Sequence, residues 1–145
     1  MLCCQRITRL CFALFAAAAC WGCGSNSGLE IHPAEGSVSF SGQPLAGATV
    51  VFTPASKSEE AQKDAQAETD ENGEFAIKTF DGKKYHAGVA SGDYIVTITK
   101  LELPKDMRGQ PKHLLPKQYR SASTSPLKAS VSADSETRFD FQLEK

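Results

Sequence analysis

Cysteine can take part in more kinds of chemistry than the other residues of this chain, and all five cysteines lie within the first 23 positions. Cys20 and Cys23 are spaced as C-x-x-C, a pattern that can hold zinc or form a redox-active dithiol. Both uses need a surrounding fold, and a zinc site also needs a second pair of ligands. No cysteine occurs from position 24 to the C-terminus, so that part has neither an internal disulfide nor a cysteine-based metal site. The pair therefore indicates processing of the chain rather than metal or redox chemistry.

An apolar segment leads up to these cysteines. Arg6 and Arg9 come before it, and residues 10–19 are apolar, which is the pattern of a signal peptide. A helix that spans a membrane needs roughly 20 apolar residues, so this segment is too short to span by itself. We predict a signal peptide over residues 1–19. An uncleaved N-terminal anchor and ordinary secretion after cleavage are the alternatives.

Cys20 directly follows three alanines at residues 17–19. This arrangement resembles a bacterial lipobox, although the usual leucine is missing. In such signals a diacylglycerol is attached to the cysteine sulfur, and the chain is cut just before that cysteine. We therefore predict lipidation at Cys20, with Cys23 as the alternative because the bulky Trp21 fits poorly before it. Either choice predicts a domain outside the cytoplasm that is anchored by lipid to a membrane of the cell envelope.

The histidines and carboxylates form no catalytic or metal-binding pattern. His32, His86 and His113 are far apart and lack the spacing of metal ligands. Residues 70–74 could be read as a calcium loop, but the later ligands are out of register, and a solvated hairpin turn is favoured. No G-x-S-x-G elbow and no glycine-rich phosphate loop occur. We expect a protein that is not an enzyme, with no catalytic residue, metal or cofactor.

A basic stretch is the candidate contact region. Six basic residues and two acids lie within residues 100–120, and residues 101–126 are predicted to form one long irregular loop. Such a loop could contact an anionic glycan, a wall polymer or lipid headgroups. The alternative is a solvated loop that Leu114, Leu115 and Tyr119 attach to the fold. The formal net charge of −1 argues against nucleic acid as a partner. The candidate contact residues are Lys112, His113, Lys117, Tyr119 and Arg120.

From residue 34 onward, apolar and polar residues alternate in short runs that turn residues separate, which predicts strands. Residues 55–67 and 79–89 are expected to be loops, and Asn72-Gly73 favours a hairpin turn. The pattern predicts an all-β domain over residues 34–145, a seven-stranded antiparallel β-sandwich, after a tether over residues 20–33. The expected strands include 37–40, 48–53, 74–78, 94–100, 127–131 and 137–143, and residues 66–69 lead into the turn. The predicted core consists of Val38, Phe40, Val50, Phe52, Phe75, Ile77, Tyr94, Val96, Ile98, Val131, Phe139, Phe141 and Leu143.

Three motifs carry a resemblance to a known family. They are GSVSFSGQPLAGATV at residues 36–50, TDENGEF at residues 69–75 and GDYIV at residues 92–96. In this order they resemble the carboxypeptidase regulatory-like domain, and the match covers about residues 35–100. The resemblance implies a transthyretin-like, immunoglobulin-like β-sandwich of the kind that some small envelope lipoproteins carry alone. In its family setting the domain accompanies a peptidase and is not the catalytic part.

These observations together predict a non-catalytic cell-envelope lipoprotein with one β-sandwich for binding or structural roles. The first alternative is a carbohydrate-binding or adhesion module that uses residues 101–126. The second is an accessory subunit of a secreted enzyme. The expected partners are the membrane, reached through the lipid anchor, and an envelope protein or glycan.

Overall fold

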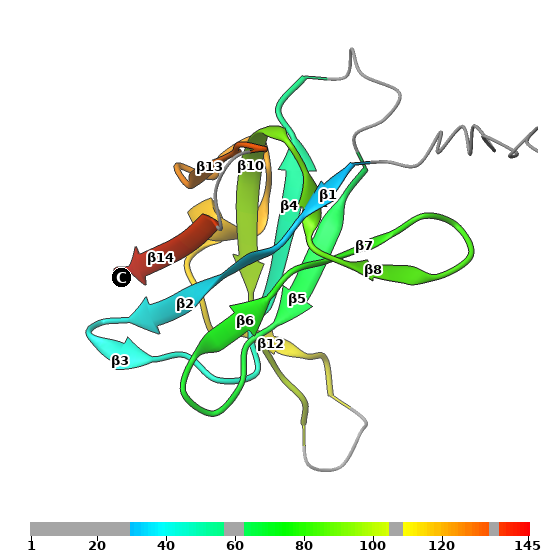
Figure 1. Cartoon of the computed structure of the whole chain (residues 1–145). Coiled ribbons are helices and arrows are strands. Elements are labelled where there is room, and N and C mark those ends of the chain that lie inside the picture. Colours follow the sequence, from blue (N-terminus) through cyan, green and yellow to red (C-terminus); the bar gives the residue numbers. More distant parts are fainter. Residues whose placement is uncertain (1–29, 57–62, 105–108, 134–136) are drawn as a thin grey trace, which may run out of the picture.

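The computed structural model describes residues 30–56, 63–104, 109–133 and 137–145, and Figure 1 shows that strands joined by turns and loops make up this part of the chain. The predicted signal peptide, Cys20 and Cys23 lie outside these residues. In the described part, no helix is long and apolar enough to cross a membrane. The elements are β1 (Ile31–His32), β2 (Ala34–Phe40), β3 (Gln43–Pro44), β4 (Thr49–Pro54), β5 (Ala65–Glu68), β6 (Glu74–Ala76), β7 (Lys78–Phe80), β8 (Tyr85–Ala87), β9 (Val89–Ala90), β10 (Gly92–Thr99), β11 (Leu101–Glu102), β12 (Lys112–His113), the short 3-10 helix η1 (Lys117–Arg120), β13 (Lys128–Val131) and β14 (Thr137–Leu143).

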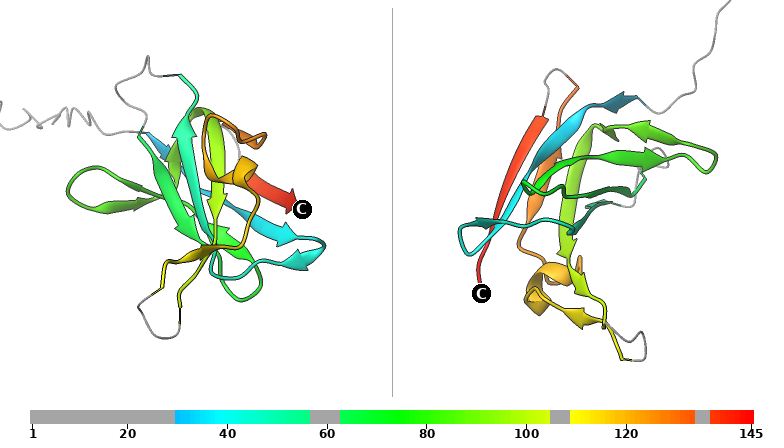
Figure 2. Two further views of the ribbon diagram at one scale, coloured as in Figure 1. Left: turned by 180° about the vertical axis from the view of Figure 1, so that it is seen from behind. Right: turned by 90° about the horizontal axis from the view of Figure 1, so that it is seen from below.

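Two sheets lie face to face (Figures 1 and 2). The larger sheet has the order β13-β10-β4-β5-β7-β8 and is antiparallel throughout. The smaller sheet has the order β14-β2-β3, and β6 also pairs with β2. Two short pairs, β1 with β9 and β11 with β12, lie outside these sheets. The predicted all-β sandwich is confirmed.

The core lies between the sheets because alternate side chains of each strand point to the same face. Strand β10 shows this alternation most plainly, since Tyr94, Val96 and Ile98 are buried while the residues between them are partly exposed. Phe52 of β4 is fully buried at the centre of an aromatic cluster, where it contacts the rings of Phe75, Tyr94, Phe139 and Phe141. Every residue of the predicted core is buried except Phe40 and Phe139, which are partly buried and pack against it.

The described residues contain more strands than the seven that the alternation predicts. Residues 79–89, expected to be a loop, contain β8, most of β7 and the first residue of β9. β1 falls inside the predicted tether and pairs with β9, so the sandwich of the described residues includes Ile31 and His32. Residues 101–126, expected to be irregular, contain β11, β12 and η1. Alternation missed these elements because each spans two to four residues, too few for a period to show.

The expected strand over residues 74–78 is two strands in two different sheets. β6 pairs with β2, whereas β7 pairs with β5. Ile77 lies between them, and its N–H donates to Ala34 O at 2.9 Å while its carbonyl accepts from Gly88 N at 2.8 Å. The chain therefore passes from one sheet to the other at a buried residue whose backbone groups both remain hydrogen-bonded.

Strands β2 and β14 pair in parallel, which departs from the all-antiparallel prediction. Their register aligns Gly36 with Phe139 over a pairing that runs from Ala34–Thr137 to Phe40–Leu143. Strands joined by a tight turn must be antiparallel, but these two lie about 100 residues apart in the chain, so either direction is open to them. A Cβ at Gly36 would lie 1.9 Å from Phe139 O. The close approach of the two strands therefore requires glycine at this position.

Candidate functional site

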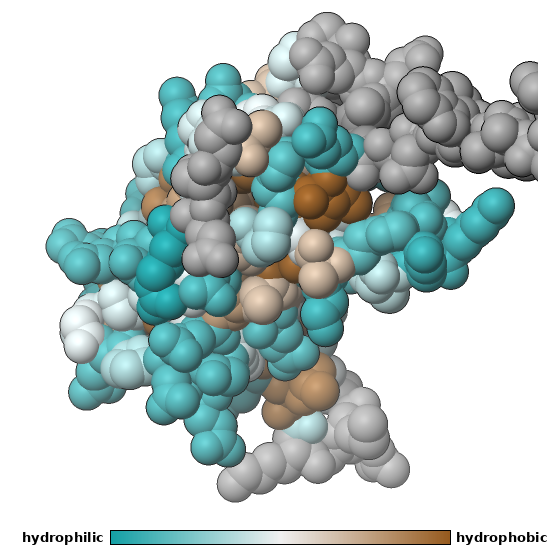
Figure 3. Space-filling model, viewed as in Figure 1, coloured by the Kyte–Doolittle hydropathy of each residue, from teal (hydrophilic) through white to brown (hydrophobic). Residues whose placement is uncertain are grey.

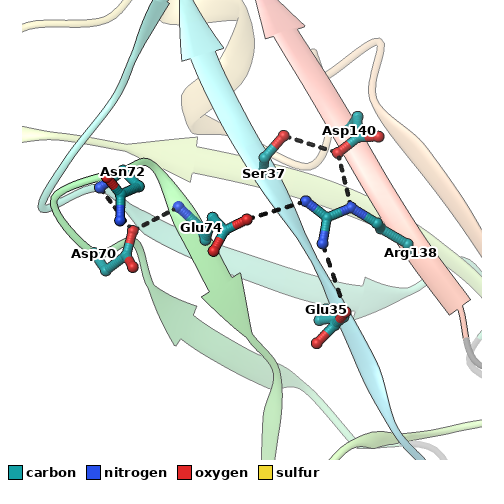
Figure 4. Close-up of polar contacts among 7 residues, drawn as sticks. All are labelled: Glu35, Ser37, Asp70, Asn72, Glu74, Arg138 and Asp140. Atoms are coloured by element: carbon teal, nitrogen blue, oxygen red, sulfur yellow. Dashed lines mark hydrogen bonds and ion pairs between the residues drawn. The ribbon is translucent and has the colours of Figure 1, made fainter.

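Arg138 is the centre of a charged cluster on the outer face of the smaller sheet (Figure 4). Its guanidinium donates from Nη2 to Glu74 Oε1 at 3.3 Å and lies 3.5 Å from both Glu35 Oε1 and Asp140 Oδ1. Ser37 Oγ donates to the same Asp140 Oδ1 at 2.8 Å. The parallel register brings these groups together, because it aligns Arg138 with Glu35 and Asp140 with Ser37.

The contacts of this charged cluster link neighbouring strands, and they do not suit Arg138 to catalysis. The hydrogen bond with Glu74 raises the pKa of Arg138 further, so the guanidinium stays charged and cannot transfer a proton. A shallow groove of about 460 Å³ lies beside it, with Glu35, Glu68, Asp70 and Glu74 among its lining residues. Because three carboxylates already surround the guanidinium, it would bind an incoming anion only weakly. The arrangement joins β14, β2 and β6 at the surface.

The turn at residues 70–73 satisfies its own backbone through Asp70. Asp70 Oδ1 accepts from Asn72 N at 2.9 Å and from Glu74 N at 2.8 Å. Gly73 has a φ of +76° there, a conformation that glycine adopts without strain. A turn forms here as predicted, but it is not the expected hairpin, because it leads from β5 into β6 of the other sheet. Among the described residues, no three His, Cys, Asp or Glu side chains form a group that could hold a metal ion.

The structure separates the five candidate contact residues. Lys112 and His113 are exposed on β12, where they pair with Glu102 and Leu101 of β11. Lys117 is exposed at the start of η1. Tyr119 and Arg120 also lie in η1, and both are less exposed than the other three candidate residues.

Tyr119 is only 6% exposed, and its hydroxyl accepts a hydrogen bond from Glu144 N at 3.2 Å. Its ring belongs to the core and is not offered to a ligand, which corrects its place in the predicted contact surface. Arg120 is partly buried, and its Nε has no hydrogen-bond partner. Of the three residues expected to attach this segment, Leu115 and Tyr119 are buried, whereas Leu114 is exposed.

Two hairpins that project from the sandwich carry exposed features that the sequence did not single out. The β11–β12 hairpin bears exposed leucines, among them Leu103 at 68% exposure, and Figure 3 shows a hydrophobic patch at this lower end. The β7–β8 hairpin bears Phe80 and Tyr85, and its hydrophilic tip projects on the right of Figure 3. Asp81-Gly82 between two aromatic residues was the turn signal that could have revealed the second hairpin.

The fold and these surfaces define a small all-β sandwich with two projecting hairpins. A family model described as a domain of unknown function (DUF6795) matches residues 34–100. No curated protein matches the chain. The comparisons do not confirm the carboxypeptidase regulatory-like resemblance, which stays a prediction.

Two solved structures are similar to the chain. One is the major pilin subunit of Bacillus cereus, with 18% identity and a TM-score of 0.43 over 79% of this chain and 29% of the pilin chain. The other is a 9R-lipoxygenase from Cyanothece, with 17% identity and a TM-score of 0.36 over 80% of this chain and 16% of the lipoxygenase chain. The chain thus spans less than a third of either protein.

Proposed function

We propose that the protein is a non-catalytic cell-envelope lipoprotein whose β-sandwich is a binding module held close to a membrane. The observation that supports this proposal is the position of β1, the first strand of the described residues, which starts at Ile31. Cleavage before Cys20 would leave residues 21–30 between the lipidated residue and the sandwich. At about 3.3–3.6 Å for each extended residue, this tether keeps β1 within about 40 Å of the bilayer surface.

The surface that fits a partner best is the β11–β12 hairpin. It lies at the end of the sandwich away from the start of β1 (Figures 1 and 2), so a module anchored through its N-terminus would present it away from the bilayer. Leu101, Leu103 and Leu114 are exposed there, beside Lys112 and His113. Exposed apolar side chains rimmed by polar ones are typical of protein contact sites.

A protein partner fits this surface better than a glycan does. Sugar rings often bind by stacking on exposed aromatic side chains, and Tyr119, the aromatic residue of the predicted contact loop, is in the core. The exposed leucines instead offer the apolar area that protein interfaces bury. An envelope protein, such as an enzyme to which this chain is an accessory subunit, therefore suits the hairpin better than a carbohydrate.

Two measurements test the proposal. The intact mass of the mature protein, purified from detergent-solubilised membranes, should equal that of the chain from Cys20 plus its lipid. A mass without diacylglycerol would contradict the anchoring. Crosslinking in membranes should capture a specific envelope protein, and Leu101→Ser with Leu103→Ser should abolish that capture. A control, Lys128→Ser on the exposed face of β13, should leave it unchanged, and capture that survives both leucine substitutions would contradict the contact surface.

A further inference from the structure

The β7–β8 hairpin presents an aromatic pair to solvent. Phe80 and Tyr85 are cross-strand partners, and their ring centroids lie 5.0 Å apart. They are 45% and 57% exposed. Gln66 Nε2 of the neighbouring β5 donates to the Tyr85 hydroxyl at 3.4 Å. Large aromatic side chains gain free energy from burial, so a pair left open on a projecting hairpin indicates a surface that something else covers.

The tip of this hairpin is basic. Asp81 Oδ1 accepts from the backbone N–H groups of Lys83 and Lys84 at 2.7 and 2.8 Å, and Asp81 Oδ2 lies 2.7 Å from His86 Nε2. The only acid between residues 78 and 87 is thus held within the turn. The exposed side chains of Lys83 and Lys84 extend the tip, and the surface around the aromatic pair attracts anions.

The same hairpin lies beside the point where the chain enters the fold. β1 pairs with β9, which directly follows β8, and Ile31 is aligned with Ala90. A Cβ at Gly88 would lie 2.2 Å from His32 O, so the base of the hairpin and β1 are in close contact. Both views of the ribbon place the hairpin tip on the same side as the start of β1 (Figures 1 and 2). The residues predicted to carry the lipid precede β1 by only a short tether.

We propose that the β7–β8 hairpin rests on the anionic surface of the membrane to which the chain is anchored. Tyr85 would lie at the level of the headgroups, where a side chain with an apolar ring and a polar hydroxyl is favoured, and the apolar ring of Phe80 would be buried beside it. Lys83 and Lys84 would face the phosphates of anionic lipids, each adding roughly 5-fold to the contact equilibrium. The inference rests on the proposed lipid anchor and adds a second, reversible point of contact that sets the orientation of the sandwich.

The test is fluorescence quenching in vesicles that contain the lipidated mature protein. Trp21 is replaced by Phe in every sample, and a single tryptophan is introduced by Tyr85→Trp or, independently, by Phe80→Trp. The matched control carries Leu103→Trp on the β11–β12 hairpin at the other end. The vesicles contain phosphatidylcholine brominated near the headgroup, with and without phosphatidylglycerol. Intact mass confirms the lipid on each sample, and circular dichroism confirms its fold.

The hairpin tryptophans should be quenched and the control tryptophan should not. The quenching should be stronger with phosphatidylglycerol, and Lys83→Gln with Lys84→Gln should weaken the contact about 30-fold. Equal quenching at both ends, or none at either, in samples whose mass shows the lipid would overturn the contact while leaving the anchored module intact. Samples whose mass shows no lipid would instead overturn the proposed anchor, and with it this contact.

Discussion

Gly36→Ala should strongly destabilise the sandwich, because Gly36 allows β14 to lie against β2. The added Cβ would lie 1.9 Å from Phe139 O and 2.7 Å from the Phe75 ring. An ordinary contact is about 3.4 Å or more, so the strands must separate by about 1.5 Å. Overpacking of this kind costs about 1–3 kcal/mol, and each hydrogen bond lost between the strands costs about 0.5–1.5 kcal/mol. With two bonds lost, the free energy of unfolding should fall by about 2–6 kcal/mol.

Urea unfolding followed by circular dichroism measures this change, and native-state hydrogen exchange locates it. The matched control is Gly42→Ala, where φ is +79° and no atom lies within 4 Å of the new Cβ. Its cost is conformational only, about 1 kcal/mol. In the Gly36 variant, amide protection should decrease first in β14. If the two variants unfold at the same urea concentration, the parallel pairing of β2 and β14 does not require glycine at position 36.

Three further predictions concern the core, a buried hydroxyl and the hairpin turn. Phe52→Ala should lower the free energy of unfolding by about 3–5 kcal/mol, and the exposed Phe80→Ala by less than about 1 kcal/mol; equal losses in urea unfolding would contradict the central place of Phe52. Thr69→Val removes a hydroxyl that accepts from Ala48 N and donates to Leu45 O, both in the connection between β3 and β4, and should cost about 1–3 kcal/mol, whereas Thr69→Ser should retain most of the stability in the same assay. The hydrogen bond with His86 lowers the pKa of Asp81 from its ordinary 3.8, so its ionised form stabilises the folded state above that pH, and the contribution is lost as the pH falls through the lowered folded pKa. The melting temperature of Asp81→Asn should therefore be lower than that of the wild type near neutral pH, and this difference should shrink below about pH 4.

Period-two alternation identified the long strands and almost all of their buried faces. It succeeded for β4, β10 and β14 because each presents two or three large apolar residues to the same side. It failed for β7 and β8, where Thr79, the buried residue of β7, is polar and donates from Oγ1 to Gly88 O at 2.7 Å. A buried threonine with a backbone partner gives no apolar signal in the sequence.

The candidate contact surface was only partly predictable. The sequence marked Lys112 and His113 as available to a partner, and both are exposed on β12. It grouped Tyr119 with them, although the hydroxyl of Tyr119 contacts the backbone of Glu144 near the C-terminus and its ring is in the core. A contact between residues so far apart in the chain leaves no local pattern that a sequence could show.

The sequence by itself determined the all-β class, most of the core and the prediction of a lipid anchor, because each depends on local composition or on a short repeat. The parallel pairing of β2 with β14, the change of sheet at Ile77 and the cluster around Arg138 were decided only by the tertiary structure. Each of these depends on which distant strands become neighbours, and that choice follows from packing the whole core at once. The position of the β7–β8 hairpin beside β1 has the same origin.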